Sequence, residues 1–396
     1  MQKSIIAIIL AIYLAPALGA YFTRNYAKPP VSVAGDSEFR LTNMTSLTLA
    51  SLTSGDVYLM AQNISFNWAN TSANNWAIWY RKLDSKTLGI GADAGANFTA
   101  PLMSFFSNNY AISLNIDNET GIPQIRVYQV SLTDGAAVPR FALTSNINQS
   151  FIPSLVSLTM IKHTVYVFFK FDDQKINVAN FKVGSVSPGP LQFTVTDSDT
   201  SSSLSVVWGE SLGSKQLFAT WVENGVLKNS IIDVTRGTVA PIALGGYYKD
   251  CSCQAYATDG KWYGTLCWNF NALKGTTNLF IRTNTTSLVP FAHYYMNTST
   301  LSGAFAYGPH LVLIFSDSVT FSPSISYHYE IWNLDDLTLF KPRTHFLTID
   351  SNSTASWLIV PQGGLYTLLY NNKLRASDTF TNIQVGLLLD AWPVDR

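Results

Sequence analysis

The segment Val165-Tyr166-Val167-Phe168-Phe169 is the clearest of seven short apolar segments that recur along the chain. These segments are rich in β-branched and aromatic residues, which favour strands, and no helical period lies between them. Successive segments begin 45 to 55 residues apart, so the chain repeats one unit of roughly fifty residues. The other six segments are residues 57–60, 110–114, 217–221, 262–266, 311–315 and 365–369.

Each unit is predicted to hold four antiparallel strands. A strand and a tight turn precede each apolar segment, as at residues 46–52, and a third strand follows it, as at residues 124–130. Proline lacks the N–H that a sheet ladder needs, so it belongs on an edge strand or at the first residue of a strand. The fourth strand of each unit is therefore predicted to be its outer edge. The prolines that open these fourth strands lie 49 to 52 residues apart and are Pro139, Pro190, Pro241, Pro290 and Pro342.

The two ends of the chain complement each other. The last unit stops after its third strand, near Leu389, and the missing fourth strand is Pro30-Val31-Ser32-Val33, ahead of the first unit. We expect this N-terminal strand to pair with the last unit and close a ring, which removes exposed sheet edges.

Seven such units resemble the seven-bladed β-propeller superfamily, and the resemblance covers nearly the whole chain after its first residues. It is a resemblance of architecture, because the Trp-Asp and Gly-His signatures of WD40 blades and the Asp-box of sialidases are absent. It implies an all-β fold of four-stranded blades in one domain. A six-bladed ring is the alternative, because the first unit has Gly89 and Gly91 where the others have proline.

The N-terminus has the pattern of a cleaved signal peptide over residues 1–19, which leaves one domain over residues 20–396. Lys3 precedes an apolar run, and Ala17 and Gly19 stand at the small-x-small cleavage positions. The alternative is an uncleaved anchor, but the run is short for a membrane span. No later segment is apolar for the ~20 residues that a span requires, and the C-terminus lacks a lipid-anchor signal. We expect a secreted or cell-surface protein.

Composition narrows the class of partner. Charged residues make up 13% of the 396 residues, and 25 basic residues balance 25 acidic ones. Nucleic-acid binding depends on neutralising phosphates with an excess of Lys and Arg, so a nucleic-acid partner is excluded.

The three cysteines, Cys251, Cys253 and Cys267, flank the turn dipeptide Asp259-Gly260 of a predicted hairpin. Cys267 then lies opposite either Cys251 or Cys253. We expect one cross-strand disulfide and one remaining thiol, rather than a metal site, which would lack a nearby histidine.

The chain carries nine Asn-x-Ser/Thr sequons, and most fall in two classes of loop. Five lie between a fourth strand and the next first strand, and two lie between second and third strands, so seven share one face of the disc. Either a duplicated turn uses these residues locally, or this face carries glycans, which is our expectation. Protein partners would then dock on the opposite face or the rim. The sequons begin at Asn43, Asn63, Asn70, Asn97, Asn118, Asn148, Asn284, Asn297 and Asn352.

The innermost strands contain no pair of carboxylates and no histidine, which argues against glycoside hydrolysis and general acid–base catalysis. We therefore assign no catalytic residue, cofactor or metal. A ligand mouth on the axis is the weaker hypothesis, because aspartates also serve simply to bond turn backbones. Its candidates are Asp197, Asp199, Asp250, Asp350, Trp68, Trp76 and Trp268.

These observations predict a non-enzymatic, extracellular glycoprotein that acts as a rigid binding or assembly scaffold for proteins or glycans. The alternative is a lectin or a carbohydrate-active enzyme that uses the axial mouth.

Overall fold

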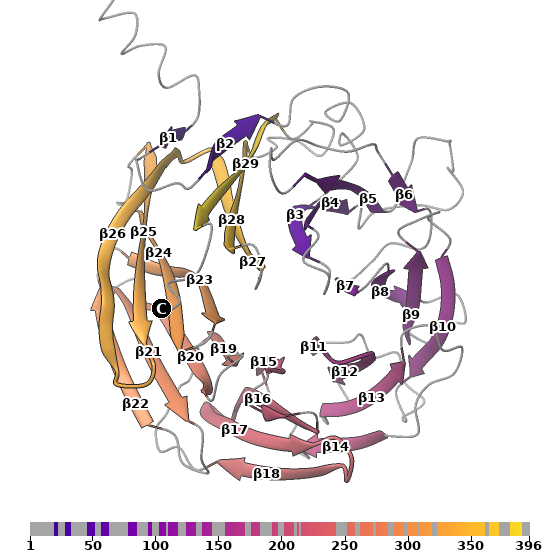
Figure 1. Ribbon diagram of the computed structural model, residues 1–396. Coiled ribbons are helices and arrows are strands. Elements are labelled where there is room, and N and C mark those ends of the chain that lie inside the picture. Colours follow the sequence, from indigo (N-terminus) through magenta and orange to yellow (C-terminus); the bar gives the residue numbers. More distant parts are fainter. Residues whose placement is uncertain are drawn as a thin grey trace, which may run out of the picture.

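The computed structural model arranges antiparallel β-sheets around a central axis (Figure 1), and the elements that it describes are strands. The description covers residues 20–22, 28–32, 46–51, 57–62, 78–84, 94–96, 103–107, 110–117, 124–131, 137–144, 155–170, 176–182, 192–196, 202–209, 212–213, 215–242, 252–257, 262–271, 275–283, 289–296, 299–307, 309–318, 323–360, 364–371 and 381–389.

The first four sheets in chain order each contain four strands, and the strands follow one another in space as they do in sequence. Sheet I contains β3 (Ser46–Ser51), β4 (Val57–Gln62), β5 (Ile78–Leu83) and β6 (Ala94–Ala96). Sheet II contains β7 (Met103–Ser107), β8 (Tyr110–Asp117), β9 (Gln124–Ser131) and β10 (Ala137–Thr144). Sheet III contains β11 (Leu155–Ile161), β12 (Thr164–Lys170), β13 (Ile176–Lys182) and β14 (Gln192–Thr196). Sheet IV contains β15 (Ser202–Val207), β16 (Gln216–Glu223), β17 (Val226–Asp233) and β18 (Thr238–Ile242).

Sheet V has the same order, whereas sheets VI and VII each include a strand from the N-terminal segment. Sheet V contains β19 (Ser252–Ala257), β20 (Tyr263–Asn271), β21 (Gly275–Thr283) and β22 (Val289–Met296). Sheet VI contains β23 (Ser299–Tyr307), β24 (His310–Ser318), β25 (Ser324–Asn333) and β26 (Thr338–Asp350), with β1 (Ala20–Phe22) as a fifth strand. Sheet VII contains β27 (Ser353–Val360), β28 (Gly364–Asn371) and β29 (Thr381–Leu389), and β2 (Lys28–Ser32) is its fourth strand.

The apolar segments of the repeat are the second strands, and where their burial is described these segments are buried on both faces of the sheet. Val165, Val167 and Phe168 are all fully buried, although neighbouring residues of a strand point to opposite faces. A strand covered on both sides needs a continuous apolar run rather than alternation. This is why the segment at residues 165–169 reads as uniformly apolar.

The first strand of each sheet lies nearest the axis in Figure 1, and serine side chains join neighbouring first strands. The Ser157 hydroxyl of β11 accepts the Val206 N–H of β15 at 3.3 Å. The Ser205 hydroxyl of β15 accepts the Ala255 N–H of β19 at 3.0 Å. Small hydroxyl residues on the innermost strands therefore bond adjacent sheets.

The outermost positions correct two expectations. Four of the repeat prolines do lie on fourth strands, but Pro139, Pro241, Pro290 and Pro342 fall inside those strands rather than opening them. Pro190 lies outside the described residues. Register shifts occur at Pro139 in β10 and around Pro342 in β26, because proline cannot complete the ladder. The expectation of four strands in every sheet is wrong for sheet VI, where β1 pairs with residues 347–349 of β26.

The N-terminal segment reaches the last sheet as expected. Lys28, Val31 and Ser32 of β2 pair antiparallel with Leu387, Val385 and Gln384 of β29. A buried apolar cluster then joins sheet VII to sheet I, with Leu368 and Val385 on one side and Leu49 and Leu59 on the other.

The disulfide joins Cys253 of β19 to Cys267 of β20, which face each other across the ladder. This settles which of the two alternative cysteines pairs with Cys267, and Cys251 lies outside the described residues. Within the described part of the chain, no helix has the length and hydrophobicity needed to cross a membrane.

Candidate functional site

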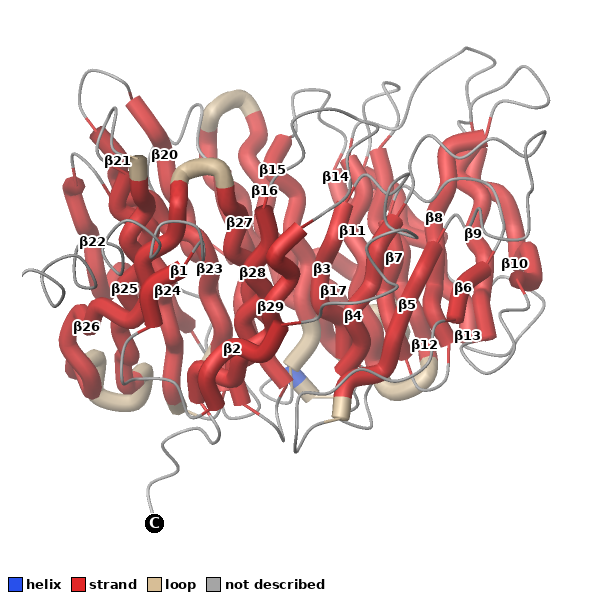
Figure 2. Tube along the Cα trace, turned by 90° about the horizontal axis from the view of Figure 1, so that it is seen from above, coloured by secondary structure: helices blue, strands red, loops and turns tan. Residues whose placement is uncertain are grey.

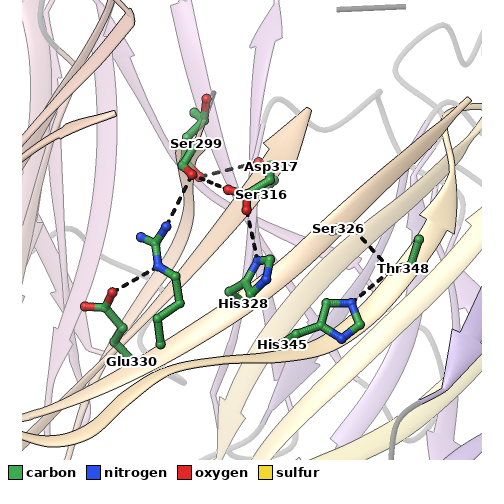
Figure 3. A network of polar contacts seen from close by, with 10 residues as sticks. Ser299, Ser316, Asp317, Ser326, His328, Glu330, His345 and Thr348 are labelled. Carbon is green, nitrogen blue, oxygen red and sulfur yellow. Dashed lines mark hydrogen bonds and ion pairs between the residues drawn. The ribbon is translucent and has the colours of Figure 1, made fainter. Parts of the chain in front are cut away.

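Sheet VI carries a polar cluster on the face that packs toward sheet V (Figure 3). The strand register places the side chains together, because Asp317 pairs with Ser326 and Ser326 pairs with Thr348. The other face of the same strands carries Tyr327 and Tyr329, which pack toward sheet VII. The cluster consists of Ser299, Asp317, Ser326, His328, Glu330, Arg343, His345 and Thr348.

Asp317 connects a serine and a histidine. The Ser299 hydroxyl donates to Asp317 Oδ1. The other carboxylate oxygen, Oδ2, lies 3.2 Å from His328 Nδ1, although the ring is not aligned for a hydrogen bond to it. The Asp317 and His328 side chains are 27% and 19% exposed, so solvent still reaches this pair.

Arg343 neutralises the buried acid of the cluster. Its Nε donates to Glu330 Oε1 at 3.1 Å, and its Nη1 donates to the Ser299 hydroxyl at 3.3 Å. The guanidinium also lies 4.4 Å from the centroid of the Phe315 ring. Glu330 is only 5% exposed and accepts a second bond from Trp332 Nε1 at 3.3 Å. A buried carboxylate with this many donors is compensated for the loss of water.

A bulge in β26 aims Arg343 at Glu330. Ile331 pairs with Lys341 and Tyr329 pairs with Thr344, so Pro342 and Arg343 together stand opposite Glu330. Proline supplies no ladder N–H, and the strand accommodates it by placing two residues against one. The bulge therefore turns Arg343 toward the face that carries the carboxylate.

Two histidines lie edge to face in the cluster, with the ring centroids of His328 and His345 5.2 Å apart. His345 Nε2 lies 2.9 Å from the Thr348 hydroxyl, which lies 3.2 Å from that of Ser326. Burial lowers the pKa of His328 below its usual value of 6.5. The charge of Asp317 opposes this shift, whereas His345 and Arg343 add to it. His328 is therefore mainly neutral at pH 7.

The arrangement suits cross-bracing better than nucleophilic chemistry. A serine nucleophile needs a base at its hydroxyl, with an acid behind the base. Here the Ser299 hydroxyl contacts the acid and a guanidinium, and the histidine lies on the far side of the acid. Among the described residues, no three His, Cys, Asp or Glu side chains come together as a metal site. The cluster joins strands β23, β24, β25 and β26.

The opposite end of sheet VI has a different character. Here the turn from β25 to β26, at residues 333–340, exposes Leu339 and Phe340, which are 41% and 48% accessible. Among the residues whose burial the structure describes, no other large apolar side chain is exposed. Leu337 in this turn has a φ of 61°, a left-handed conformation that is costly for a residue with a Cβ. We call residues 333–340 the VI turn.

The VI turn is held in place by neighbouring groups. Trp262 Nε1 of sheet V donates to Asp335 Oδ1 at 2.6 Å, and Asp336 Oδ1 accepts from the Thr338 N–H at 3.0 Å. The ring of Phe340 lies 5.0 Å from that of His310, at the start of β24. His310 is 1% exposed, and neither of its ring nitrogens has a hydrogen-bond partner.

Few of the sequence-predicted ligand residues fall in the described part of the chain. Asp350 ends β26, outside the innermost strands, and its Oδ1 accepts the Asn352 N–H at 2.8 Å. Trp268 lies in β20, a second strand. Asp197, Asp199, Asp250, Trp68 and Trp76 lie outside the described residues. The axial mouth stays a prediction.

One sequon can be placed. Asn352 is exposed in the turn between β26 and β27, which is a connection from a fourth strand to the next first strand. The other sequon asparagines lie outside the described residues: Asn43, Asn63, Asn70, Asn97, Asn118, Asn148, Asn284 and Asn297.

Sequence reasoning did not find the polar cluster or the VI turn. The cluster draws its polar residues from four strands, and only the register brings them together. The VI turn had a local signal in Asp335-Asp336-Leu337-Thr338-Leu339-Phe340, where large apolar residues adjoin a turn that ends a strand.

No family model matches the chain, and neither does any curated protein. Solved structures do resemble it. An oligogalacturonate lyase in complex with manganese aligns over 94% of this chain and 96% of its own, with a TM-score of 0.53 and 7% identity. The WD40 domain of Toxoplasma gondii coronin aligns over 93% and 86%, with a TM-score of 0.48 and 12% identity. The Dos1 propeller aligns over 88% and 90%, with a TM-score of 0.47 and 10% identity. At such identities the likeness concerns the fold alone. The antiparallel sheets of four or five strands arranged around one axis, with their first strands innermost, make the chain a β-propeller.

Proposed function

We propose that this β-propeller is a secreted or cell-surface glycoprotein that serves as a rigid, non-enzymatic scaffold for binding other extracellular proteins. The proposal includes a ring of seven blades, closed by the N-terminal strand.

Several features support a rigid ring. The described strands form seven sheets, β2 adds to the last of them, and that sheet packs on the first. Side-chain hydroxyls and apolar clusters bind neighbouring sheets to one another. A stiff platform of this kind loses little conformational entropy when a partner docks, which favours binding.

The observation that carries the proposal is the contrast between the two ends of β26. The exposed sequon residue Asn352 follows one end, and the exposed Leu339 and Phe340 lie near the other. Strands run between the two faces of the disc (Figure 2), so these ends belong to opposite faces. A glycan on one face and apolar side chains on the other favour protein docking on the second.

The polar cluster supports a non-enzymatic role. Its acids are engaged, Asp317 with Ser299 and Glu330 with Arg343 and Trp332. Groups that bond one another in this way stabilise a sheet and do not present reactive atoms to a substrate.

Glycopeptide mass spectrometry of the native protein tests the first part of the proposal. We expect Asn352 to carry a glycan, and Thr354→Val, which removes the sequon but keeps the asparagine, to abolish it. Unmodified Asn352 in native material, or retention of the protein inside the cell, would contradict a secreted glycoprotein.

Cross-linking of the native protein tests the scaffold. An amine-reactive cross-linker should join a protein partner to Lys341, which lies beside the VI turn with its Nζ 4.9 Å from the centroid of the Tyr329 ring. Native protein that forms no stable complex with another protein would overturn the scaffold.

A further inference from the structure

We propose that the VI turn is a docking site for a partner protein that presents a large apolar side chain next to Lys or Arg. The proposal rests on the scaffold function and names the surface and the chemistry of the partner.

A second turn in the same molecule shows what the turn itself requires. The turn from β17 to β18, at residues 233–240, has the same position in sheet IV, and its residues match those of the VI turn one for one, 100 positions earlier. We call it the IV turn. Each turn has a polar residue first, a buried apolar residue second, and threonine sixth. The left-handed position is Gly237 in one, with φ 66°, and Leu337 in the other, with φ 61°.

The IV turn forms this backbone with small side chains, so the turn does not need large ones. Val239 is half-buried and Ala240 has little apolar surface to expose, whereas Leu339 and Phe340 are 41% and 48% exposed. Leu337 adds backbone strain that glycine avoids. Strain and exposed apolar surface at the same site are costs in the free protein, and such costs collect where a surface has a function.

The two turns also differ in charge. The exposed pair Thr235 and Arg236 in the IV turn becomes the exposed pair Asp335 and Asp336 in the VI turn. Both carboxylates are positioned, one by Trp262 and the other by Thr338. Two fixed negative charges beside two apolar side chains complement a basic residue beside an apolar one.

His310 supplies an independent indication of a ligand. It is 1% exposed, both ring nitrogens lack a hydrogen-bond partner, and the half-exposed Phe340 ring lies against it. A buried polar group with no partner costs free energy. A partner that displaces the Phe340 ring reaches His310 and supplies the missing hydrogen bond.

Selection from a random peptide library displayed on phage, against the full-length protein, tests the proposal. We expect the enriched peptides to combine an aromatic or aliphatic residue with Lys or Arg. The double variant Leu339→Ser/Phe340→Ser should bind synthetic versions of these peptides about tenfold or more weakly, as the loss of central apolar contacts does elsewhere. The double variant Asp335→Asn/Asp336→Asn should lower the affinity for these peptides less, and should make that affinity less dependent on salt. The matched control Val239→Ser/Ala240→Ser should leave binding unchanged.

His310→Leu separates binding from folding. Removing an unpartnered imidazole should raise the melting temperature, whereas the loss of its hydrogen bond should weaken the selected peptides. Weaker binding by a more stable protein cannot come from misfolding.

Three results would overturn the inference. The VI turn is not the docking site if the enriched peptides are acidic, or if the peptides bind the IV-turn and VI-turn variants equally. A native partner that still cross-links to the Leu339→Ser/Phe340→Ser variant would also show that the VI turn is not the docking site, while the scaffold function would remain supported. Absence of any native protein partner removes the scaffold function itself.

Discussion

Sheets IV and VI are two copies of the same unit that differ mainly in their outer strands. In sheet IV, β18 has five residues that pair with β17 without a register shift. In sheet VI, β26 has thirteen residues and three register shifts, and β1 adds to it. The inner strands of both sheets pack as apolar layers. The fold is therefore set by the inner strands, and the outer strand is where one copy acquires distinct chemistry.

The two ends of sheet VI acquired that chemistry in opposite ways. At the end near Asn352, hydrogen bonds and ion pairs join polar side chains of four strands. At the VI turn, Leu337 is strained and His310 is unsatisfied. The first end stabilises the sheet and the VI turn destabilises it, which is the pattern expected of a structural brace and a binding surface.

The largest effect should come from removing the cation of the brace. Arg343→Met leaves the buried Glu330 carboxylate without its ion pair, which should lower the free energy of unfolding by about 3 kcal/mol in urea titrations. Arg236→Met, an exposed arginine in the IV turn, should change it by less than about 0.5 kcal/mol. The double variant Arg343→Met/Glu330→Gln should recover most of the free energy of unfolding that Arg343→Met loses. A loss below about 1 kcal/mol for the single variant would show that the brace contributes little.

A smaller effect should follow from exchanging the left-handed residues of the two turns. Gly237→Leu should cost about 1–2 kcal/mol, because a Cβ is unfavourable at this φ. Leu337→Gly should gain about 0.5 kcal/mol, since the relief of strain is partly offset by the greater freedom of glycine in the unfolded chain. Both changes are measurable as shifts in thermal midpoint. A thermal midpoint that does not rise in Leu337→Gly would mean that Leu337 is not strained.

The smallest effect should be a pH dependence specific to sheet VI. Because the folded pKa of His328 is lowered, the unfolded chain binds more protons near pH 6 than the folded chain does. Its contribution to stability is complete above the unfolded value and decreases as pH falls, with a slope of at most about 1.4 kcal/mol per pH unit. Denaturation midpoints between pH 7.5 and pH 5 should show this slope in the wild type and less of it in His328→Gln.

The sheets could be predicted because their information is local. Apolar runs such as residues 165–169 mark second strands, and the repeat prolines mark outer strands. The pairing of β2 with β29 followed from the missing strand of the last unit. The short strand β1 had no such signal, because three residues immediately after a predicted signal peptide carry no periodicity.

The sites could not be predicted in the same way. Arg343 meets Glu330 only because Pro342 forces a bulge, and no residue count along the chain gives that geometry. The prediction that a pair of the cysteines forms a cross-strand disulfide was confirmed, because a hairpin turn fixes which residues face each other. The burial of His310 without a hydrogen-bond partner is a property of packing, so the sequence carries no signal for it.

The attachment of the N-terminal segment to the last two sheets has a consequence for biosynthesis. Residues 20–22 pair with β26 and residues 28–32 pair with β29, so these two strands find their partners in segments that are translated much later. The ribosome adds about 5–20 residues per second, so these strands wait for tens of seconds before they can pair. Sheets I to V can meanwhile form in order as each leaves the ribosome. The N-terminal strands are added after these sheets, and residues 20–22 and 28–32 gain the protection of strand pairing only once β26 and β29 have been translated.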